Sequence, residues 1–155
     1  MMIELRIAQV SDLDAILEIM AEGHNESAFV GTYDAWTARH YLKSFMQLDH
    51  SELMLAVDGD EILGGVMMAA SWEWCKEPIA YVVKFWVRVS ARRTRASRHL
   101  MQYIDEFARS WGCSSVYATA TAELNKTEQR LFENLFAKHG FANCGATLKK
   151  GLYNG

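Results

Sequence analysis

The alternation of apolar and polar positions is clearest between residues 81 and 111. From residue 81 to residue 89 two alternating sets of side chains each contain large apolar groups, which predicts a strand covered on both faces. The two sets are Tyr81, Val83, Phe85, Val87 and Val89, and Val82, Lys84, Trp86 and Arg88. The period then becomes that of an amphipathic helix with the apolar stripe Leu100, Ile104, Phe107 and Trp111. Gly112 suits the left-handed position that ends many helices.

Apolar periodicity and turn residues predict the other elements in the same way. In order, they are a strand 3–7, a helix capped by Ser11, a loop 22–33, a helix capped by Asp34 or Thr37, a hairpin of 53–57 and 62–70 around the turn 58–61, an irregular stretch 71–78, a strand 115–120, a helix from about 125 to 139 closed by Gly140, and a final strand 141–148. The second helix is expected to bury Trp36, Tyr41, Leu42, Phe45 and Met46. This order predicts an α/β (α+β) fold, a single domain 1–155 with a mixed sheet and about four helices on its faces.

Composition and charge narrow the range of partners. The chain has 155 residues, of which 50% are hydrophobic and 23% charged, as in an ordinary globular domain. A net charge of −3 argues against a general nucleic-acid binder, and no apolar run approaches the roughly 20 residues of a membrane span. The N-terminus lacks a secretory pattern. Three widely spaced cysteines show no metal-like pairing, so we expect reduced thiols, no metal site and a cytoplasmic protein.

Arginines crowd the junction between the central strand and the helix that follows it. Five of the nine arginines lie within eleven residues, at positions 88, 92, 93, 95 and 98. A strand that turns into a helix exposes unpaired backbone N–H groups and the positive end of the helix dipole, which together favour a phosphate. Guanidinium groups add planar donors suited to bidentate contact with phosphate. The alternative is that these arginines only keep a loop hydrated.

This junction resembles a known cofactor-binding loop. The pattern Val87-x-x-x-x-Arg92-x-x-Arg95-x-Ser97 is similar to the coenzyme A loop of the GCN5-related N-acetyltransferase (GNAT) family, whose amides bind the pyrophosphate of acetyl-CoA. Arg92 matches the leading Gln or Arg of that motif, Arg95 stands where its first glycine is expected, and Ser97 where its second small residue is. Glycine lets backbone approach phosphate closely. Arg95 must therefore either swing aside and join the phosphate site or weaken cofactor binding.

The resemblance covers nearly the whole chain, because the element order also matches and the closing segment 138–141, Lys-His-Gly-Phe, is similar to the end of the family's fourth helix. It implies a mixed, mostly antiparallel twisted sheet. It also implies that the backbone of the central strand binds the pantetheine arm, with one N–H group polarising the acetyl carbonyl. The implied cofactor-binding residues are Phe85, Trp86, Val87, Val89, Arg92, Arg93, Thr94, Arg95, Ala96, Ser97 and Asn125.

The resemblance indicates a catalytic base only indirectly. Some family members carry a glutamate at the position of Tyr81, and Glu73 and Glu77 lie just upstream in a loop that could reach the acceptor. His24 and Glu26 are alternatives, because the loop after the first helix borders the acceptor pocket in the family. Each of these residues could equally be a hydrated loop residue.

The usual acid is missing, and the surroundings of the acceptor are open. Where many members have a tyrosine that protonates the thiolate, this chain has Phe136, which cannot donate a proton. Tyr117 and Tyr153 are substitutes, although Tyr117 is expected to pack in the core. Three tryptophans would wall an acceptor pocket, form a partner interface or pack in the core: Trp72, Trp74 and Trp86.

The resemblance predicts an acetyl-CoA-dependent N-acetyltransferase that acts on a primary amine of a small molecule or protein by direct attack, as a monomer or homodimer. The alternative is a catalytically silent relative that serves as a binding module, with or without coenzyme A. Nucleic-acid binding through the arginines is a third reading, which the net charge disfavours.

Overall fold

The structure is a computed structural model that describes residues 1–26, 32–119, 126–145, 148, 150 and 152. Its strands are β1 (Glu4–Ile7), β2 (Ser51–Asp58), β3 (Glu61–Ser71), β4 (Ile79–Val87) and β5 (Ser115–Ala118). Its helices are α1 (Leu13–Glu26), α2 (Ala35–Met46), α3 (Ala96–Ser110) and α4 (Lys126–Lys138), with the short 3-10 turns η1 (Val10–Asp12) and η2 (Val89–Ala91). The expected order of elements is therefore confirmed as far as α4.

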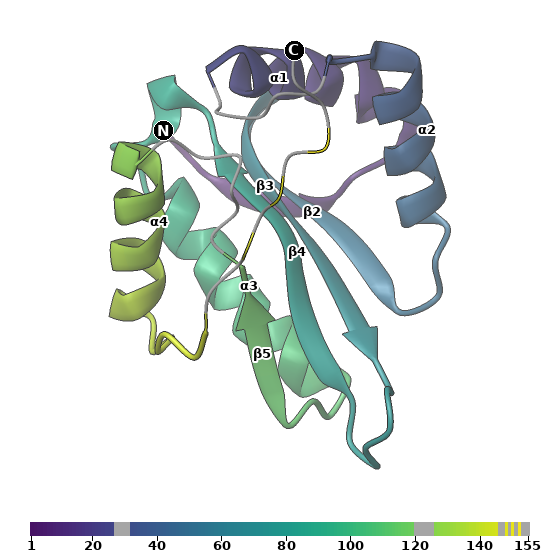
Figure 1. Cartoon of the computed structure of the whole chain (residues 1–155). Coiled ribbons are helices and arrows are strands. Elements are labelled where there is room, and N and C mark those ends of the chain that lie inside the picture. Colours follow the sequence, from purple (N-terminus) through teal and green to yellow (C-terminus); the bar gives the residue numbers. More distant parts are fainter. Residues whose placement is uncertain (27–31, 120–125, 146–147, 149, 151, 153–155) are drawn as a thin grey trace.

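The described strands form one twisted sheet in the order β1-β2-β3-β4-β5 (Figure 1). Neighbouring strands are antiparallel except for β4 and β5, which are parallel. The predicted mixed, mostly antiparallel sheet is confirmed. None of the described helices combines the length and the apolar composition needed to cross a membrane.

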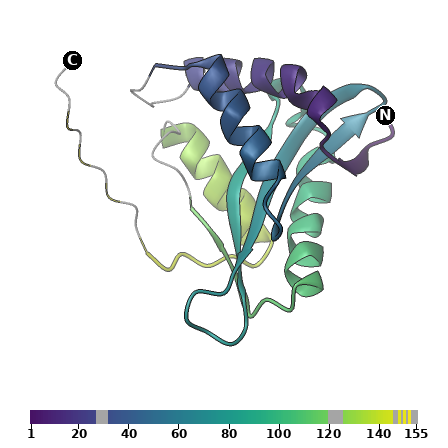
Figure 2. The same cartoon turned by 90° about the vertical axis from the view of Figure 1, so that its right-hand side faces the viewer.

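Two apolar layers hold helices on opposite faces of the sheet, with α1 and α2 on one face and α3 on the other (Figure 2). The first layer includes Leu13, Ile16, Ile19, Leu42, Phe45, Leu53, Leu55 and Met67. The second includes Val66, Met68, Val82, Leu100, Met101, Ile104, Phe107 and Phe136 of α4. Each large aliphatic side chain contributes about 1.5–3 kcal/mol by leaving water. Both layers include residues of β4, which confirms that the central strand is covered on both faces.

A β-bulge interrupts the alternation of side chains along β4. The pairing of β4 with β3 shifts between Met67 and Met68, so Val83 has no partner of its own on β3. Val83 then packs with Trp86 in the layer of α1 and α2, whereas Phe85 packs in the layer of α3. The prediction that Val83 and Phe85 share a face is wrong, because a bulge adds one residue and shifts the side chains after it.

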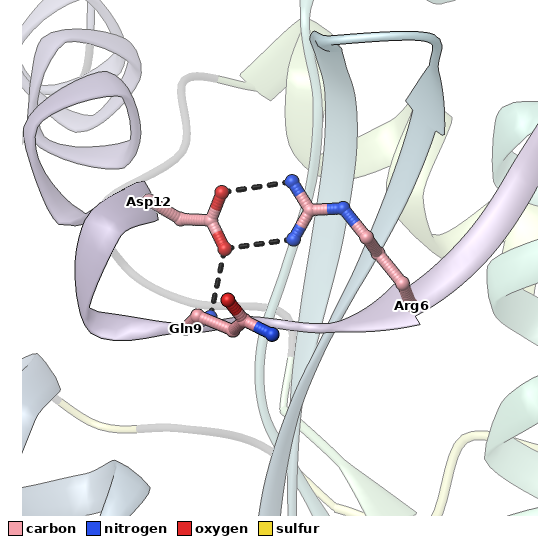
Figure 3. Close-up of polar contacts among 3 residues, drawn as sticks. All are labelled: Arg6, Gln9 and Asp12. Carbon is pink, nitrogen blue, oxygen red and sulfur yellow. Dashed lines mark hydrogen bonds and ion pairs between the residues drawn. The ribbon is translucent and has the colours of Figure 1, made fainter.

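An aspartate holds the start of α1. Asp12 accepts two hydrogen bonds from the Arg6 guanidinium at 2.7 and 2.8 Å and one from the Gln9 backbone N–H at 2.7 Å (Figure 3). Hydrogen bonding to Arg6 lowers the pKa of Asp12. The prediction that Ser11 caps this helix is wrong, because the carboxylate one residue later takes the free N–H and also reaches β1.

The two helices on this face depart from the predicted boundaries and burial. α1 continues to Glu26, so the predicted loop 22–33 is wrong over its first five residues. A single glycine such as Gly23 costs a helix about 1 kcal/mol but does not end it. Asp34 is the N-cap of α2, as expected, and accepts the Thr37 N–H at 2.8 Å. Trp36, however, is 74% exposed, and Tyr41 is exposed as well.

The apolar stripe of α2 runs through Leu42 and Phe45, which are buried. At about 100° per residue, Trp36 and Tyr41 lie 100° or more around the helix from Leu42. Trp36 instead stacks on His40, with ring centroids 5.4 Å apart. The outer face of α2 therefore carries aromatic side chains that the sequence pattern assigned to the core.

Glycines end the last two helices as predicted, with φ of 69° at Gly112 and 91° at Gly140. The final strand predicted over 141–148 is wrong for residues 141–145, which have no strand structure. Ala142, Asn143 and Gly145 offer no alternating apolar face that a sheet could bury. Residues 146 and 147 lie outside the described part of the chain. The three cysteines are free, as expected.

Candidate functional site

The central strand β4 extends beyond its neighbour β5 (Figure 1). The two strands pair from Ile79 with Ser115 to Val82 with Ala118, and β5 ends there. Beyond this point no residue in the described ranges pairs with the edge of β4 that faces away from β3. The C-terminal half of β4, which is its upper half in Figure 1, therefore has an open edge.

Phe85 and Val87 direct their backbone groups to this open edge. Arg88 donates its N–H to the Leu63 carbonyl of β3 at 2.8 Å. Because the backbone groups of successive strand residues point to opposite edges, those of Trp86 face β3 and those of Phe85 and Val87 face away from it. An extended chain lying along the edge could form β-type hydrogen bonds with these two residues.

Aromatic rings of α4 pack beside the open edge. The ring of Phe85 lies 5.3 Å from that of Phe136 and 6.4 Å from that of Phe132, as measured between centroids. Phe136 is buried. This part of α4 contributes apolar packing and, at Phe136, no group that could donate a proton.

Trp86 lies on the opposite side of the sheet from Phe85. Its ring covers Gly65 of β3, where a Cβ atom would collide with the ring. A Cβ atom at Gly64 would collide with the backbone oxygen of Trp86. Its Nε1 atom is buried and has no hydrogen-bond partner among the described residues. The structure therefore brings neither the ring nor the backbone groups of Trp86 to the open edge, although the resemblance implied that it binds cofactor.

The turn between β4 and α3 is held by a threonine. The Thr94 hydroxyl donates to the Ala91 carbonyl at 2.6 Å and accepts the Ala96 N–H at 3.2 Å. Ala96 is fully buried, whereas Val89 is exposed in η2. These contacts fix where α3 begins relative to β4.

The start of α3 is open to an anion. Arg95 occupies the N-cap position, but its side chain forms no capping hydrogen bond. Its carbonyl accepts the His99 N–H at 3.1 Å. The N–H groups of Ser97 and Arg98 have no acceptor in the part of the chain that the structure describes. Free N–H groups and the helix dipole together favour a phosphate at this position.

The arginines of the turn lie in different directions. Arg92 reaches to within 4.0 Å of the Glu128 carboxylate of α4, whereas Arg93 is exposed. Arg95 has φ of −82°, so its backbone is unstrained at the position where the family motif has glycine. Arg95 is exposed and, with Arg98, His99 and Gln102 of α3, lines a shallow hollow of about 210 Å³. Whether Arg95 joins a phosphate site or weakens cofactor binding stays a prediction.

Together, the start of α3 and the open edge of β4 fit a phosphorylated cofactor with an extended arm. The N–H groups at Ser97 and Arg98 suit its phosphates, and those of Phe85 and Val87 suit its arm. Asn125, the remaining predicted cofactor residue, lies outside the described residues.

A second cluster lies near the other end of β4, around a cavity of about 400 Å³. Its lining residues are Glu73, Trp74, Ile79, Tyr81, Tyr117 and Thr119. The Tyr81 hydroxyl donates a hydrogen bond to Glu73, which raises the pKa of Tyr81. The rings of Tyr81 and Tyr117 stack with centroids 6.0 Å apart. The structure thus brings together two of the three predicted catalytic residues.

Tyr117 is 45% exposed, so the prediction that it packs in the core is wrong. Its neighbours Val116 and Ala118 pack in the layer of α3. Because side chains alternate along a strand, Tyr117 points to the other face of the sheet, which α1 and α2 leave uncovered at this end. Ile79 and Thr119 were also missed, because only the register of β4 against β5 brings them to the cavity.

The other candidates lie apart from this cluster. Glu77 is exposed and does not line the cavity. Trp72 packs with His50 and Trp111, with ring centroids 4.8 and 5.9 Å from its own, so of the three predicted tryptophans only Trp74 lines the cavity. Outside the description lie the side chains of His24 and Glu26 and the whole of Tyr153.

The cavity borders the point at which β4 and β5 part. Tyr81 pairs with Tyr117, and the next pair, Val82 with Ala118, is the last one. Along β4, Tyr81 lies about 20 Å from Val87 at about 3.3 Å per residue. The cavity therefore lies beside the paired part of β4, and the start of α3 lies beyond the other end of the open edge.

Comparison with known proteins places these features in context. A family model described as the Acetyltransferase (GNAT) family matches residues 13–141. No curated protein matches the sequence.

Solved structures share the fold at low identity. A transcriptional regulator from Bacillus halodurans C-125 is 18% identical, with a TM-score of 0.78 over 97% of this chain and 100% of its own. Glucosamine-6-phosphate N-acetyltransferase from Arabidopsis thaliana is 12% identical, with a TM-score of 0.74 over 99% and 100%. AAC(6')-Iy, solved in complex with a bisubstrate analogue of coenzyme A, is 14% identical, with a TM-score of 0.73 over 99% and 100%. At these identities the likeness establishes the fold.

Proposed function

Because the chain belongs to the GNAT acetyltransferase family, we propose that it transfers an acetyl group from acetyl-CoA to a primary amine of a small molecule or protein. The family uses acetyl-CoA. When bound, acetyl-CoA supplies a thioester whose carbon forms a bond to the amine nitrogen while the C–S bond breaks and coenzyme A leaves.

The open edge of β4 carries this proposal. Its free N–H groups at Phe85 and Val87 would hold the extended arm of the cofactor and orient the acetyl carbonyl. At the upper end of the edge, the N–H groups of Ser97 and Arg98 would hold the pyrophosphate, with Arg92 as an additional cation. One ligand would thus satisfy backbone groups in two places.

The cavity at the lower end supports Glu73 as the group that takes a proton from the incoming ammonium. Its carboxylate already accepts a hydrogen bond from Tyr81. The raised pKa keeps the Tyr81 phenol protonated at neutral pH, so Tyr81 suits a positioning role better than that of a base. Glu77 does not line the cavity. Phe136 offers no acid for the leaving sulfur.

Isothermal titration calorimetry with acetyl-CoA tests the cofactor site. We expect binding to the intact chain, and we expect Arg92→Ala to weaken it by roughly 10- to 150-fold, as for the loss of one charge-assisted hydrogen bond. Arg109→Ala, at the opposite end of α3 from this turn, is the control and should leave the affinity unchanged. No binding at millimolar acetyl-CoA would remove the proposal, and an unaltered affinity in Arg92→Ala would reject the role of Arg92.

A catalytically silent binding protein is the second candidate. It is favoured by the ion pair in which Glu128 engages Arg92, and by phenylalanine in the position of the usual acid. The two candidates differ in turnover. Release of free coenzyme A thiol during incubation with acetyl-CoA and a panel of primary amines would exclude the silent protein, whereas tight cofactor binding without release would favour it.

A further inference from the structure

The cavity over the paired ends of β4 and β5 is open to solvent and is bordered by exposed aromatic rings. Trp74 is 90% exposed, and Tyr117 has nearly half of its surface exposed. The stacked rings of Tyr81 and Tyr117 also line it, together with Ile79. At about 400 Å³ the cavity is within the range of small-molecule sites, which runs from about 300 to 1,000 Å³. An apolar or aromatic body would find flat partners on this surface.

Among the described residues that line this cavity, one carries a carboxylate. Of its lining residues only Glu73 carries a charge, and the remaining polar side-chain groups are the hydroxyls of Tyr81, Tyr117 and Thr119 and the indole N–H of Trp74. An ammonium group would be attracted both by the carboxylate and by the faces of the rings. One negative charge matches one positive charge, so the lining favours a monoamine.

The cavity also lies near the open edge of β4, to which the proposed function assigns the cofactor. It borders the last pair of β4 and β5, directly below the open edge of β4. Glu73 accepts a hydrogen bond from Tyr81, one residue before that last pair, so a nitrogen held at Glu73 would lie near the point at which the two strands part. We infer, resting on the proposed function, that this cavity binds the acceptor, and that the acceptor is a primary monoamine joined to an aromatic ring by a short alkyl chain.

In this arrangement the ammonium lies at Glu73 and the aromatic ring of the acceptor lies against Tyr117 and Trp74. A polyamine would place a second ammonium among rings, with no second carboxylate among the lining residues that the structure describes. An amino sugar would place several hydroxyls against Trp74 and Ile79, which offer them one N–H group and no acceptor. Both classes are therefore poorer matches than an arylalkyl amine.

Binding of 2-phenylethylamine to the protein without cofactor tests the inference directly. Calorimetry gives the affinity for each ligand. We expect 2-phenylethylamine to bind at least about tenfold more tightly than 2-phenylethanol, which has the same ring but no charge. We expect spermidine and glucosamine to bind more weakly than 2-phenylethylamine.

Variants then assign the contacts. Glu73→Gln should weaken 2-phenylethylamine about tenfold, whereas Asp105→Asn, an exposed carboxylate of α3, should not. Tyr117→Leu should weaken it about 3- to 30-fold by removing an aromatic face, and Tyr117→Phe, which keeps the ring, should bind nearly as the parent does. Far-ultraviolet circular dichroism confirms that each variant is folded.

The outcomes separate this inference from the acetyl-transfer proposal. Equal affinity for 2-phenylethylamine and 2-phenylethanol, or no effect of Glu73→Gln, would overturn the assignment of the cavity. Thiol release from acetyl-CoA with spermidine or glucosamine but not with 2-phenylethylamine would overturn the substrate class and leave acetyl transfer standing. Binding of 2-phenylethylamine by a chain that does not bind acetyl-CoA would instead support the cavity and remove the proposed reaction.

Discussion

At the residue scale, two aspartates near the start of α1 pair with arginines in different ways. The side chain of Asp12 is 12% exposed and accepts hydrogen bonds from both terminal guanidinium nitrogens of Arg6, whereas that of Asp14 is 89% exposed and contacts one nitrogen of Arg39 at 2.5 Å. Exposed pairs contribute about 0–1 kcal/mol, because water screens them and two long side chains lose freedom. The bidentate pair of Asp12 also fixes the direction of β1 relative to α1.

We expect Asp12→Asn to lower the free energy of unfolding by about 1 kcal/mol at pH 7. Because Arg6 depresses the pKa of Asp12 in the folded protein, this stabilisation is complete above the unfolded aspartate pKa of about 3.9. It is lost as the pH falls through the lower pKa of the folded state. Urea unfolding of both proteins between pH 7 and pH 2.5 should therefore show a difference that shrinks toward the acid end.

Asp14→Asn is the control and should change the free energy of unfolding by less than about 0.5 kcal/mol at pH 7. A difference between Asp12→Asn and the parent that is independent of pH would contradict the assignment, because it would come from packing rather than from the charge of Asp12.

The sequence pattern could show that a helix begins near residue 12, but it could not choose between Ser11 and Asp12. Both residues are good helix-starting groups. The choice is made by Arg6, which lies on a strand and reaches the helix only after β1 has paired with β2. A cap that depends on a tertiary partner is invisible to local propensity.

At the element scale, β4 has one paired edge and one half-open edge. Its existence, its burial on both faces and the helix that follows could be predicted from apolar periodicity alone. The bulge at Val83 could not, because Val82 and Val83 are identical side chains that suit either face. The pairing with β3 decides which of them faces α3.

Hydrogen exchange of β4 amides should report the open edge residue by residue. Without ligand, we expect the Phe85 and Val87 amides to exchange faster than the Trp86 amide, which faces β3. Saturating acetyl-CoA should slow Phe85 and Val87 by about tenfold or more while Trp86 changes little, so Trp86 is an internal control. Nuclear magnetic resonance resolves the three amides. Equal protection of all three amides without ligand would mean that the edge is already paired.

At the scale of the whole molecule, the two clusters differ in how far the sequence could predict them. The arginine turn is contiguous, so its charge and its place before α3 were readable from residues 88–98. The cavity is lined by residues of a loop, β4 and β5. Tyr117 lies beside it only because β5 pairs in parallel with β4, in the register that sets Tyr117 against Tyr81. The sequence indicated Glu73 and Tyr81 through a resemblance, but it held no signal that could place Tyr117 or Thr119 beside them.

A ligand that spans the open edge should stabilise the fold as a whole, because it binds the folded chain and does not bind the unfolded chain. At a concentration 100 times its dissociation constant, acetyl-CoA should add about 2.7 kcal/mol to the free energy of unfolding. For a chain of this length, that raises the melting temperature by about 5–10 °C. Differential scanning calorimetry over a series of ligand concentrations measures the shift.

S-acetylpantetheine, which has the arm and the thioester but no pyrophosphate, divides this shift between the two ends of the edge. At equal concentration it should raise the melting temperature much less than acetyl-CoA does, because it leaves the N–H groups of Ser97 and Arg98 without an anion. In Arg92→Ala the acetyl-CoA shift should fall toward that of S-acetylpantetheine, while the shift with S-acetylpantetheine stays the same. Equal shifts from both ligands in the parent chain would show that the start of α3 binds no phosphate, and the cofactor would then be held by the strand edge alone.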